Sequence, residues 1–207
     1  TSLQVEAQTI YPYDVSKAVH AGGAENFYVG SQETDPFCLN FNANGTKMFV
    51  LGGSGDDINE YTLGTGFDHS TATFETRHSI AAQETVTSAM QFSDDGRKMF
   101  VIGSTGDDIT EYLLPDPYDV ANRAPVSSTF SVAAQENLPS GMSFNHDGTQ
   151  LYVIGTTSDS IHVYELPNAY SISNGARFTG SFSVADQELT PQSIAFNNDG
   201  TQLFVLG

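Results

Sequence analysis

Side chains that can bind a cation or a polar ligand recur along this chain at a nearly constant spacing. Four Gln-Glu pairs have their glutamines 51, 52 and 52 residues apart: Gln32-Glu33, Gln83-Glu84, Gln135-Glu136 and Gln187-Glu188. A second acidic set lies in short turns after apolar runs and comprises Asp56, Asp57, Asp107, Asp108 and Asp159. Hard cations such as Ca²⁺ need several oxygen ligands. We therefore predict that the Gln-Glu pairs bind a ligand and that the aspartates form a metal site, with Ca²⁺ as the candidate cation and no other cofactor.

The same residues also have a structural interpretation, which stays open beside the functional one. A side chain repeated in every unit most simply performs a task that every unit needs. For the Gln-Glu pairs, this task would be bonding backbone donors that are buried at a turn. The aspartates would cap tight turns through local backbone bonds. Repetition favours this interpretation, because binding sites usually break internal symmetry.

Two further landmarks keep a fixed distance from each pair, so the chain is a tandem repeat of about 52 residues. A Phe follows each glutamine by nine residues, and a Gly follows each Phe by four: Phe41, Phe92, Phe144 and Phe196, with Gly45, Gly96, Gly148 and Gly200. Each unit is predicted to hold four strands, with the second at 47–52 and 150–155, the third at 57–63 and 160–166, and the fourth at 177–188. The Asn-Gly and Asp-Gly turns suit two-residue hairpins with positive φ angles.

Four-stranded units of this length, with second strands apolar on both faces, are typical of β-propeller blades. The order FNHDGTQLYVIG and then SIHVYEL resembles the blades of lactonase-like, YVTN-type and WD40-like propellers over nearly the whole chain. The resemblance implies an all-β propeller. It transfers no activity, because lactonase-like propellers use metal or His-carboxylate sites in the central channel and no such site can be matched here residue by residue.

The repeat phase predicts how the ring closes. We expect one β-propeller domain over residues 1–207, with approximate repeats 1–52, 53–103, 104–155 and 156–207. The chain ends in a second strand, 201–207, and residues 2–16 are similar to a third strand and its loop. The N-terminal strand is therefore expected to complete the C-terminal blade, giving four blades and no open sheet edge. An eight-bladed dimer and a polymer linked by strand exchange are the alternatives.

The charge and composition limit the classes of partner. Asp and Glu number 25 against 7 Lys and Arg, so the net charge is −18 and a phosphate backbone is repelled. Nucleic acid is therefore excluded, and so is membrane insertion, because no apolar run approaches about 18 residues. The charge suits an extracellular location or the surface of a virion or cell. The single Cys38 excludes an internal disulfide framework.

Motifs for common enzyme chemistry are missing from the sequence. It has no Gly-x-Ser-x-Gly nucleophile elbow and no phosphate-binding loop. The histidines show no paired metal spacing, and we place His162 at the surface. His78 stands where other repeats have Phe130 and Phe182, so we expect it to be a partly buried substitute for an aromatic ring.

These observations predict a non-enzymatic extracellular or virion-associated module for binding or assembly. Its partners would be a glycan or protein surface, or a second copy joined through the N-terminal strand. One alternative is a lactonase-like hydrolase with a divalent cation in the channel. Another is a filament subunit linked by exchange of the terminal strand.

Overall fold

The computed structural model describes residues 27–173, 175–197 and 199–207, and in these residues the chain is all-β apart from one 3-10 turn, η2 (His69–Thr71). The first blade holds β1 (Pro36–Phe41), β2 (Lys47–Gly52), β3 (Asp57–Leu63) and β4 (Ala72–Ser79). The second holds β5 (Thr87–Phe92), β6 (Lys98–Gly103), β7 (Asp108–Leu113) and β8 (Ser128–Ser131). The third holds β9 (Pro139–Phe144), β10 (Gln150–Gly155), β11 (Ser160–Glu165) and β12 (Arg177–Ser183). The fourth holds β13 (Ser193–Phe196) and β14 (Leu203–Leu206).

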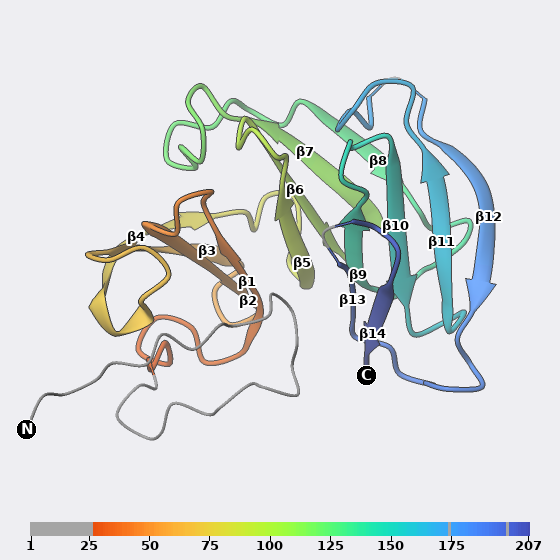
Figure 1. Ribbon diagram of the computed structural model, residues 1–207, viewed down its shortest axis with the longest axis horizontal. Coiled ribbons are helices and arrows are strands. Elements are labelled where there is room, and N and C mark those ends of the chain that lie inside the picture. The colour runs from red at the N-terminus through yellow and green to blue at the C-terminus, as the bar shows by residue number, and fades with distance from the viewer. Residues whose placement is uncertain (1–26, 174, 198) are drawn as a thin grey trace, which may run out of the picture.

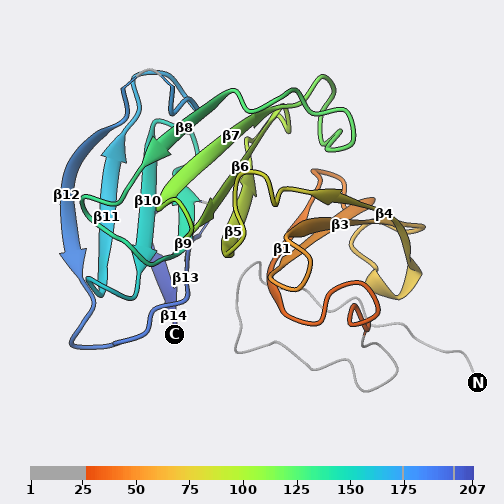
Figure 2. The same ribbon diagram turned by 180° about the vertical axis from the view of Figure 1, so that it is seen from behind.

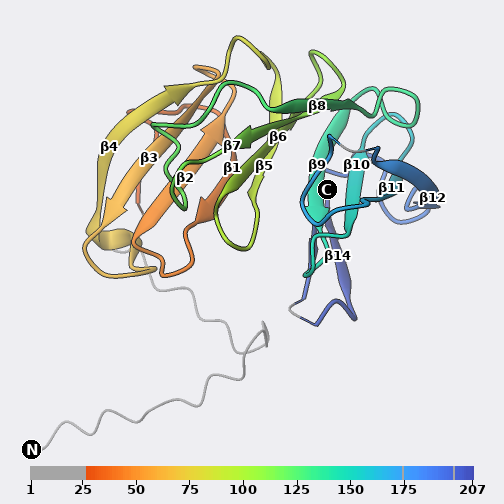
Figure 3. The same cartoon turned by 90° about the horizontal axis from the view of Figure 1, so that it is seen from above.

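Each blade is an antiparallel meander in which strands pair in chain order. The first strands, β1, β5, β9 and β13, lie toward the middle of the molecule, whereas the last strands of the complete blades lie toward its periphery (Figure 1). The views from behind (Figure 2) and from above (Figure 3) both show the second blade between the first and the third. This architecture confirms the predicted all-β propeller. In the described part of the chain, no helix has the length and apolar character needed to cross a membrane.

Successive blades pack face to face through their second strands. Phe49 and Leu51 of β2 contact Met90 of β5 and Val101 of β6, and all four side chains are buried. Equivalent apolar clusters join the second blade to the third and the third to the fourth. A second strand in the interior is therefore covered on both faces. This explains why its sequence has no polar side.

The fourth strands are shorter than the sequence analysis predicts. The prediction of a strand over 177–188 is wrong at its C-terminal end, because β12 stops at Ser183. Residues 184–188 form a turn in which the amides of Gln187 and Glu188 both donate to the Val184 carbonyl, 2.8 and 2.9 Å away. The Gln-Glu pair therefore lies in the connection to the next blade and not in the strand.

The first hairpin of each blade also differs from the predicted two-residue turn. In the first blade the glycine, Gly45, has a positive φ of 71°, and Asn44 does not. The Asn44 side chain instead accepts the Thr46 amide at 3.1 Å, a local bond that Asp95, Asp147 and Asp199 repeat. Two positive-φ residues are not needed, because the side chain supplies part of the turn.

The fourth blade is open at one edge in the described part of the chain. Its strand β14 is hydrogen-bonded to β13, whereas β2, β6 and β10 each lie between two strands. Phe204 and Leu206 are 56% and 66% exposed, although their equivalents Phe49 and Leu51 are fully buried. The predicted completion of this blade by residues 2–16 lies outside the described residues. The four approximate repeats do not coincide with the blades, because each limit between two repeats falls between the second and third strands of a blade.

Candidate functional site

The Gln-Glu turn of the second blade shows what the glutamate does. The Oε1 atom of Glu84 accepts the amide of Val86 at 2.7 Å and the amide of Thr105 at 3.1 Å. Val86 belongs to the same turn, whereas Thr105 follows β6, so one carboxylate joins two loops at the same end of the blade. Glu84 is buried, and a carboxylate that binds two backbone donors satisfies groups that would otherwise lose their hydrogen bonds.

The other blades repeat this contact. Glu33 accepts the amides of Asp35 and Ser54 at 2.7 and 3.1 Å, Glu136 accepts those of Leu138 and Thr157 at 2.8 and 3.2 Å, and Glu188 accepts that of Thr190 at 2.8 Å. The structural interpretation predicts these bonds. A direct role of the pairs in binding a ligand stays a prediction.

The glycine that ends each second strand makes room for the carboxylate. A Cβ atom placed on Gly103 would lie 2.3 Å from Cδ of Glu84. The corresponding distance is 2.3 Å at Gly52, 2.4 Å at Gly155 and 2.3 Å at Gly207. Such distances are shorter than any real contact, so the repeated glycine and the repeated glutamate form one structural unit.

The glutamines of the pairs hold the third strands. Their Oε1 atoms lie close to buried tyrosine hydroxyls: 3.5 Å for Tyr61 and Gln32, 3.2 Å for Tyr112 and Gln83, and 3.2 Å for Tyr164 and Gln135. Burial raises the pKa of Tyr112 to about 12, so the hydroxyl keeps its proton and donates to the glutamine.

The third blade alone differs in the turn after its second strand. Ser158 replaces the glycine found at positions 55 and 106, and His162 replaces Asn59 and Thr110. The Ser158 hydroxyl donates to Oε2 of Glu136 at 2.7 Å and lies 2.8 Å from Nε2 of His162. His162 is 5% exposed, so our placement of it at the surface is wrong, and burial lowers the pKa of this imidazole.

The aspartate turns are compact in the three complete blades. Asp56, Asp107 and Asp159 have φ angles of 49°, 49° and 45°, and their carbonyls accept the amides of Ile80, Val132 and Val184. Asp tolerates this left-handed conformation better than most residues, which accounts for its recurrence.

Asp57 and Asp108 follow these turns and are partly withdrawn from water. Desolvation raises the pKa of each carboxyl group. Among the described residues, no group of three or more His, Cys, Asp or Glu side chains is placed to hold a metal ion. The described residues therefore do not fit the channel cation that the lactonase-like resemblance implies, and the metal role of the five aspartates stays a prediction.

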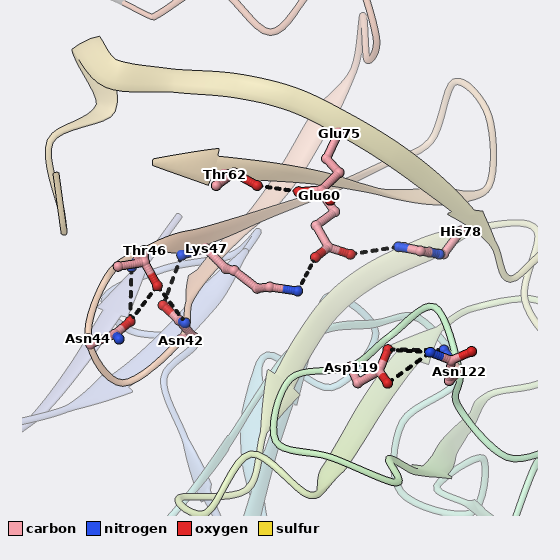
Figure 4. A network of polar contacts seen from close by, with 10 residues as sticks. All are labelled: Asn42, Asn44, Thr46, Lys47, Glu60, Thr62, Glu75, His78, Asp119 and Asn122. Atoms are coloured by element: carbon pink, nitrogen blue, oxygen red, sulfur yellow. Dashed lines mark hydrogen bonds and ion pairs between the residues drawn. The ribbon is translucent and has the colours of Figure 1, made fainter. Parts of the chain in front are cut away.

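Figure 4 shows another buried carboxylate, that of Glu60 in β3, whose two partners come from β2 and β4 of the same blade. Glu60 is bonded to Lys47 at 2.5 Å and to Nε2 of His78 at 2.7 Å. Burial raises the pKa of Glu60, but the bonds from His78 and Lys47 outweigh it, so the pKa lies below its usual value. His78 occupies an aromatic position, as predicted, but it is buried and not partly buried, and its ring nitrogen bonds Glu60.

A cavity of about 350 Å³ lies where the four first strands approach one another. Every blade contributes the residue four positions before its landmark Phe: Phe37, Ser88, Ser140 and Gln192. Apolar walls come from Val86, Leu138 and Leu206. We call this space the axial cavity. Its described lining holds hydroxyl groups, an amide and apolar side chains, but no ionisable group.

The Gln-Glu turns lie directly behind this lining. The amides that Glu84 and Glu136 bind are those of Val86 and Leu138, which are wall residues of the axial cavity. The glutamates thus position the cavity wall through its backbone. The sequence analysis missed the lining residues because they are uncharged and are not the same in all four blades, although their fixed distance from the landmark Phe could have marked them.

Comparisons with known proteins identify the fold. No family model matches the chain, and no curated protein does so. A candidate 6-phosphogluconolactonase from Bacteroides uniformis ATCC 8492 matches with a TM-score of 0.59 at 16% identity, over 82% of this chain and 46% of that one. The periplasmic gluconolactonase PpgL of Pseudomonas aeruginosa matches with a TM-score of 0.54 at 16% identity, over 83% and 42%. The β-propeller domain of Myceliophteria thermophila Cps50 (Swd1) matches with a TM-score of 0.55 at 12% identity, over 83% and 50%.

This chain therefore spans about half the length of the solved structures that it matches. Identities this low establish the fold alone. The repeat pattern, the blade topology and these matches together show that the chain has the β-propeller fold of the lactonase-like and WD40-like structures.

Proposed function

We propose that the axial cavity is the ligand site of this propeller and that it takes a neutral sugar lactone. The observation that carries this proposal is the composition of the cavity wall, to which all four blades contribute and which combines hydroxyl groups with apolar side chains. A volume of about 350 Å³ lies within the range of small-molecule sites. Ring CH groups would pack on Phe37 and Leu206, and ring hydroxyls would bond to Ser88 and Gln192.

Charge favours a neutral lactone over a phosphorylated one. The net charge of −18 repels anions at long range, and the described lining offers no Lys, Arg or His to neutralise a phosphate group. Two of the similar structures are named for 6-phosphogluconolactone, and another is named for gluconolactone. The wall of this cavity suits the second substrate.

A lactonase-like hydrolase is the function that this site and the comparisons support together. In the hydrolysis, the oxygen of a water molecule bonds to the carbonyl carbon, and negative charge develops on the carbonyl oxygen. The bond from that carbon to the ring oxygen then breaks, and the ring oxygen takes up the proton released by the water, so that lactone and water give the hydroxy acid. Hydroxyl donors such as those of Ser104 and Thr156, which line the cavity, can stabilise that charge. No step is assigned to a cation, because the described residues do not form a site for one.

A second candidate is a binding module that takes a neutral glycan without chemistry. The observation in its favour is that the described cavity wall holds no side chain able to take up or release a proton near neutral pH. Both candidates bind their ligand in the axial cavity, but only the hydrolase converts it to a product.

The test measures binding and hydrolysis separately. We expect glucono-δ-lactone to bind, its 6-phosphate to bind more weakly, and Phe37→Ser to reduce affinity about tenfold, which corresponds to about 1.4 kcal/mol. Phe182→Ser is the control, because Phe182 on β12 is also exposed, 66% against 52% for Phe37, but lies outside the cavity wall. Binding with no hydrolysis above the buffer rate selects the binding module. Equal affinities for the two variants, or tighter binding of the phosphate, would refute the assignment of the site.

A further inference from the structure

The turns after the second strands begin in the wall of the axial cavity. In the three complete blades they comprise residues 53–56, 104–107 and 156–159. In the second blade, the amide of Ser104 donates to the carbonyl of Val86 at 3.0 Å. In the third blade, the amide of Thr156 donates to the carbonyl of Leu138 at 3.2 Å. All four residues line the cavity, so Ser104 and Thr156 are equivalent hydroxyl groups of its wall.

The turn of the third blade has further bonds that the turn of the second blade lacks. Oε2 of Glu136 accepts the amide of Ser158 at 3.1 Å and its hydroxyl at 2.7 Å. The Ser160 hydroxyl donates to the carbonyl of Ser158 at 2.8 Å. The second blade has Gly106 and Asp108 at the positions of these two serines, so neither hydroxyl is present there. The third turn is therefore fixed both to the glutamate behind it and to the strand that follows it.

A buried histidine completes this network. Nε2 of His162 lies 2.8 Å from Oγ of Ser158. Because the Ser158 hydroxyl gives its one proton to Glu136, the imidazole must donate this bond, and Nε2 carries the proton. Burial lowers the pKa of His162, so the ring is neutral at pH 7 and Nδ1 holds a lone pair. The ring is therefore a fixed donor to Ser158.

The packing of the blades holds His162 in place. His162 of β11 is paired with Val153 of β10 and lies two residues before Tyr164, so the three side chains share one face of the blade. Val153 and Tyr164 belong to the apolar cluster that joins the second blade to the third. The network around Ser158 is thus anchored in a packed interface.

A hydroxyl that is held in place stabilises a developing charge better than a mobile one, because no reorganisation is needed during the reaction. We propose that Thr156 donates its hydroxyl to the carbonyl oxygen of the ligand, with Ser158 and His162 as positioning residues that fix its turn. The assignment rests on the proposed function for the identity of the ligand. It adds an orientation, in which the lactone carbonyl faces the third blade.

The first blade suits the opposite end of such a ligand. Its residue equivalent to Thr156 is Gly53, which has no hydroxyl. A Cβ atom placed on Gly53 would lie 2.9 Å from Cε2 of Phe37, so the aromatic ring covers this position. The ring CH groups of a sugar would pack on Phe37, with the carbonyl toward the third blade.

Two equivalent hydroxyl groups allow a matched test with glucono-δ-lactone and the full chain. Thr156→Val removes one hydroxyl and keeps the shape of the side chain, and Ser104→Ala removes the other. We expect the affinity to fall about tenfold in Thr156→Val and about twofold in Ser104→Ala. Where the wild type hydrolyses the lactone, kcat of Thr156→Val should fall more than its KM changes, because the bond strengthens as charge develops on the carbonyl oxygen.

A double-mutant cycle tests the positioning residues. Ser158→Gly and His162→Thr install the residues that the second blade has at positions 106 and 110. We expect each to lower the affinity about threefold, but to have no further effect in a Thr156→Val background, where the hydroxyl that they position is absent. Ser158→Thr keeps the hydroxyl and should lose less affinity than Ser158→Gly. Circular dichroism at the assay temperature checks that each variant is folded.

Three results would overturn the inference, and they can be told apart. Equal losses of affinity in Thr156→Val and Ser104→Ala would show that the carbonyl does not face the third blade. An effect of Ser158→Gly that is undiminished in the Thr156→Val background would show that Ser158 does not act through Thr156. A wild-type protein that neither binds nor hydrolyses the lactone would refute the proposed function itself, and the inference with it.

Discussion

Replacing Glu136 and Glu84 by glutamine in separate variants measures how much a buried carboxylate contributes to joining two blade loops. The two sites are equivalent in the repeat but differ in their bonds. Both Oε1 atoms accept two backbone amides, but Oε2 of Glu136 also accepts the amide of Ser158 at 3.1 Å and its hydroxyl at 2.7 Å. Oε2 of Glu84 is buried without a partner among the described residues.

The difference in bonds predicts a difference in stability. A hydrogen bond to a charged acceptor contributes about 1.5–3 kcal/mol to stability, and a bond to a neutral acceptor about 0.5–1.5 kcal/mol. In the glutamine variants the two backbone amides still bond Oε1, but this oxygen is now neutral, so each of the two bonds becomes weaker by roughly 1 kcal/mol. Glu84→Gln should therefore cost about 2 kcal/mol. In Glu136→Gln, the new amide group also faces the Ser158 amide, donor against donor, which adds roughly 1–3 kcal/mol. That variant should cost about 3–5 kcal/mol.

Urea unfolding of both variants and of the wild type at pH 7 provides the measurement. The slope of the free energy of unfolding against urea should stay constant, since the surface exposed on unfolding does not change. Glu136→Gln must shift the midpoint more than Glu84→Gln does. Equal shifts, or a larger shift for Glu84→Gln, would refute the view that backbone bonding determines the role of these residues.

The comparison of the wild type with Glu136→Gln also predicts how the free energy of unfolding depends on pH. Burial raises the pKa of Glu136, but bonds from Leu138, Ser158 and Thr157 outweigh it, so the folded-state pKa lies below the usual value. Because the unfolded chain then binds a proton more readily, the contribution of Glu136 is complete above the unfolded pKa of about 4.3. It is lost as the pH falls through the folded value. The stability gap between the wild type and Glu136→Gln should therefore stay constant from pH 7 to about pH 5 and shrink below about pH 4.

Three further perturbations have expected outcomes. Cys38 should react with a thiol reagent more slowly in the native than in the unfolded protein, because desolvation raises the pKa of this half-buried thiol and the thiol donates to a backbone carbonyl. Tyr164→Phe should lower the free energy of unfolding by about 1 kcal/mol in urea, through loss of the bond to Gln135. His78→Phe should destabilise the protein by about 1–3 kcal/mol at pH 7, although it restores the residue of the other blades, because Glu60 then loses a buried partner.

The architecture could be predicted because one pattern is repeated and each copy obeys the same physical rules. An apolar second strand must be covered on both faces, and this requirement alone implies neighbours stacked on either side. The Phe and Gly landmarks recur because the ring of a loop residue covers the hairpin in every complete blade. The predicted strand limits were wrong where the sequence has no alternation of apolar and polar residues, as at the turn of residues 184–188 that follows β12.

The roles of the repeated acidic residues could be predicted only as alternatives. A glutamate that binds a cation and a glutamate that binds two backbone amides have the same spacing in the sequence, since both must lie at a turn. The difference lies in the distance from Oε1 to particular amides, such as the 2.7 Å to that of Val86, and depends on how two loops meet in space. The glycine at the end of each second strand was the available clue, because the carboxylate occupies the space that a Cβ would need.

Positions that are constant between the blades and positions that vary have different roles in this molecule. In the three complete blades Glu33, Glu84 and Glu136 each bond the amides of the same two loops, so a change would leave backbone donors unpaired in a partly buried turn. Glu188 repeats the bond within its own turn. The residues facing the axis are not constant, although the backbone places them alike: the second and third blades have Ser88 and Ser140, whereas the first has Phe37 and the fourth has Gln192. Under the proposed function, discrimination between ligands would reside in the positions where the side chains differ, and it would depend on the glutamates that hold the wall from behind.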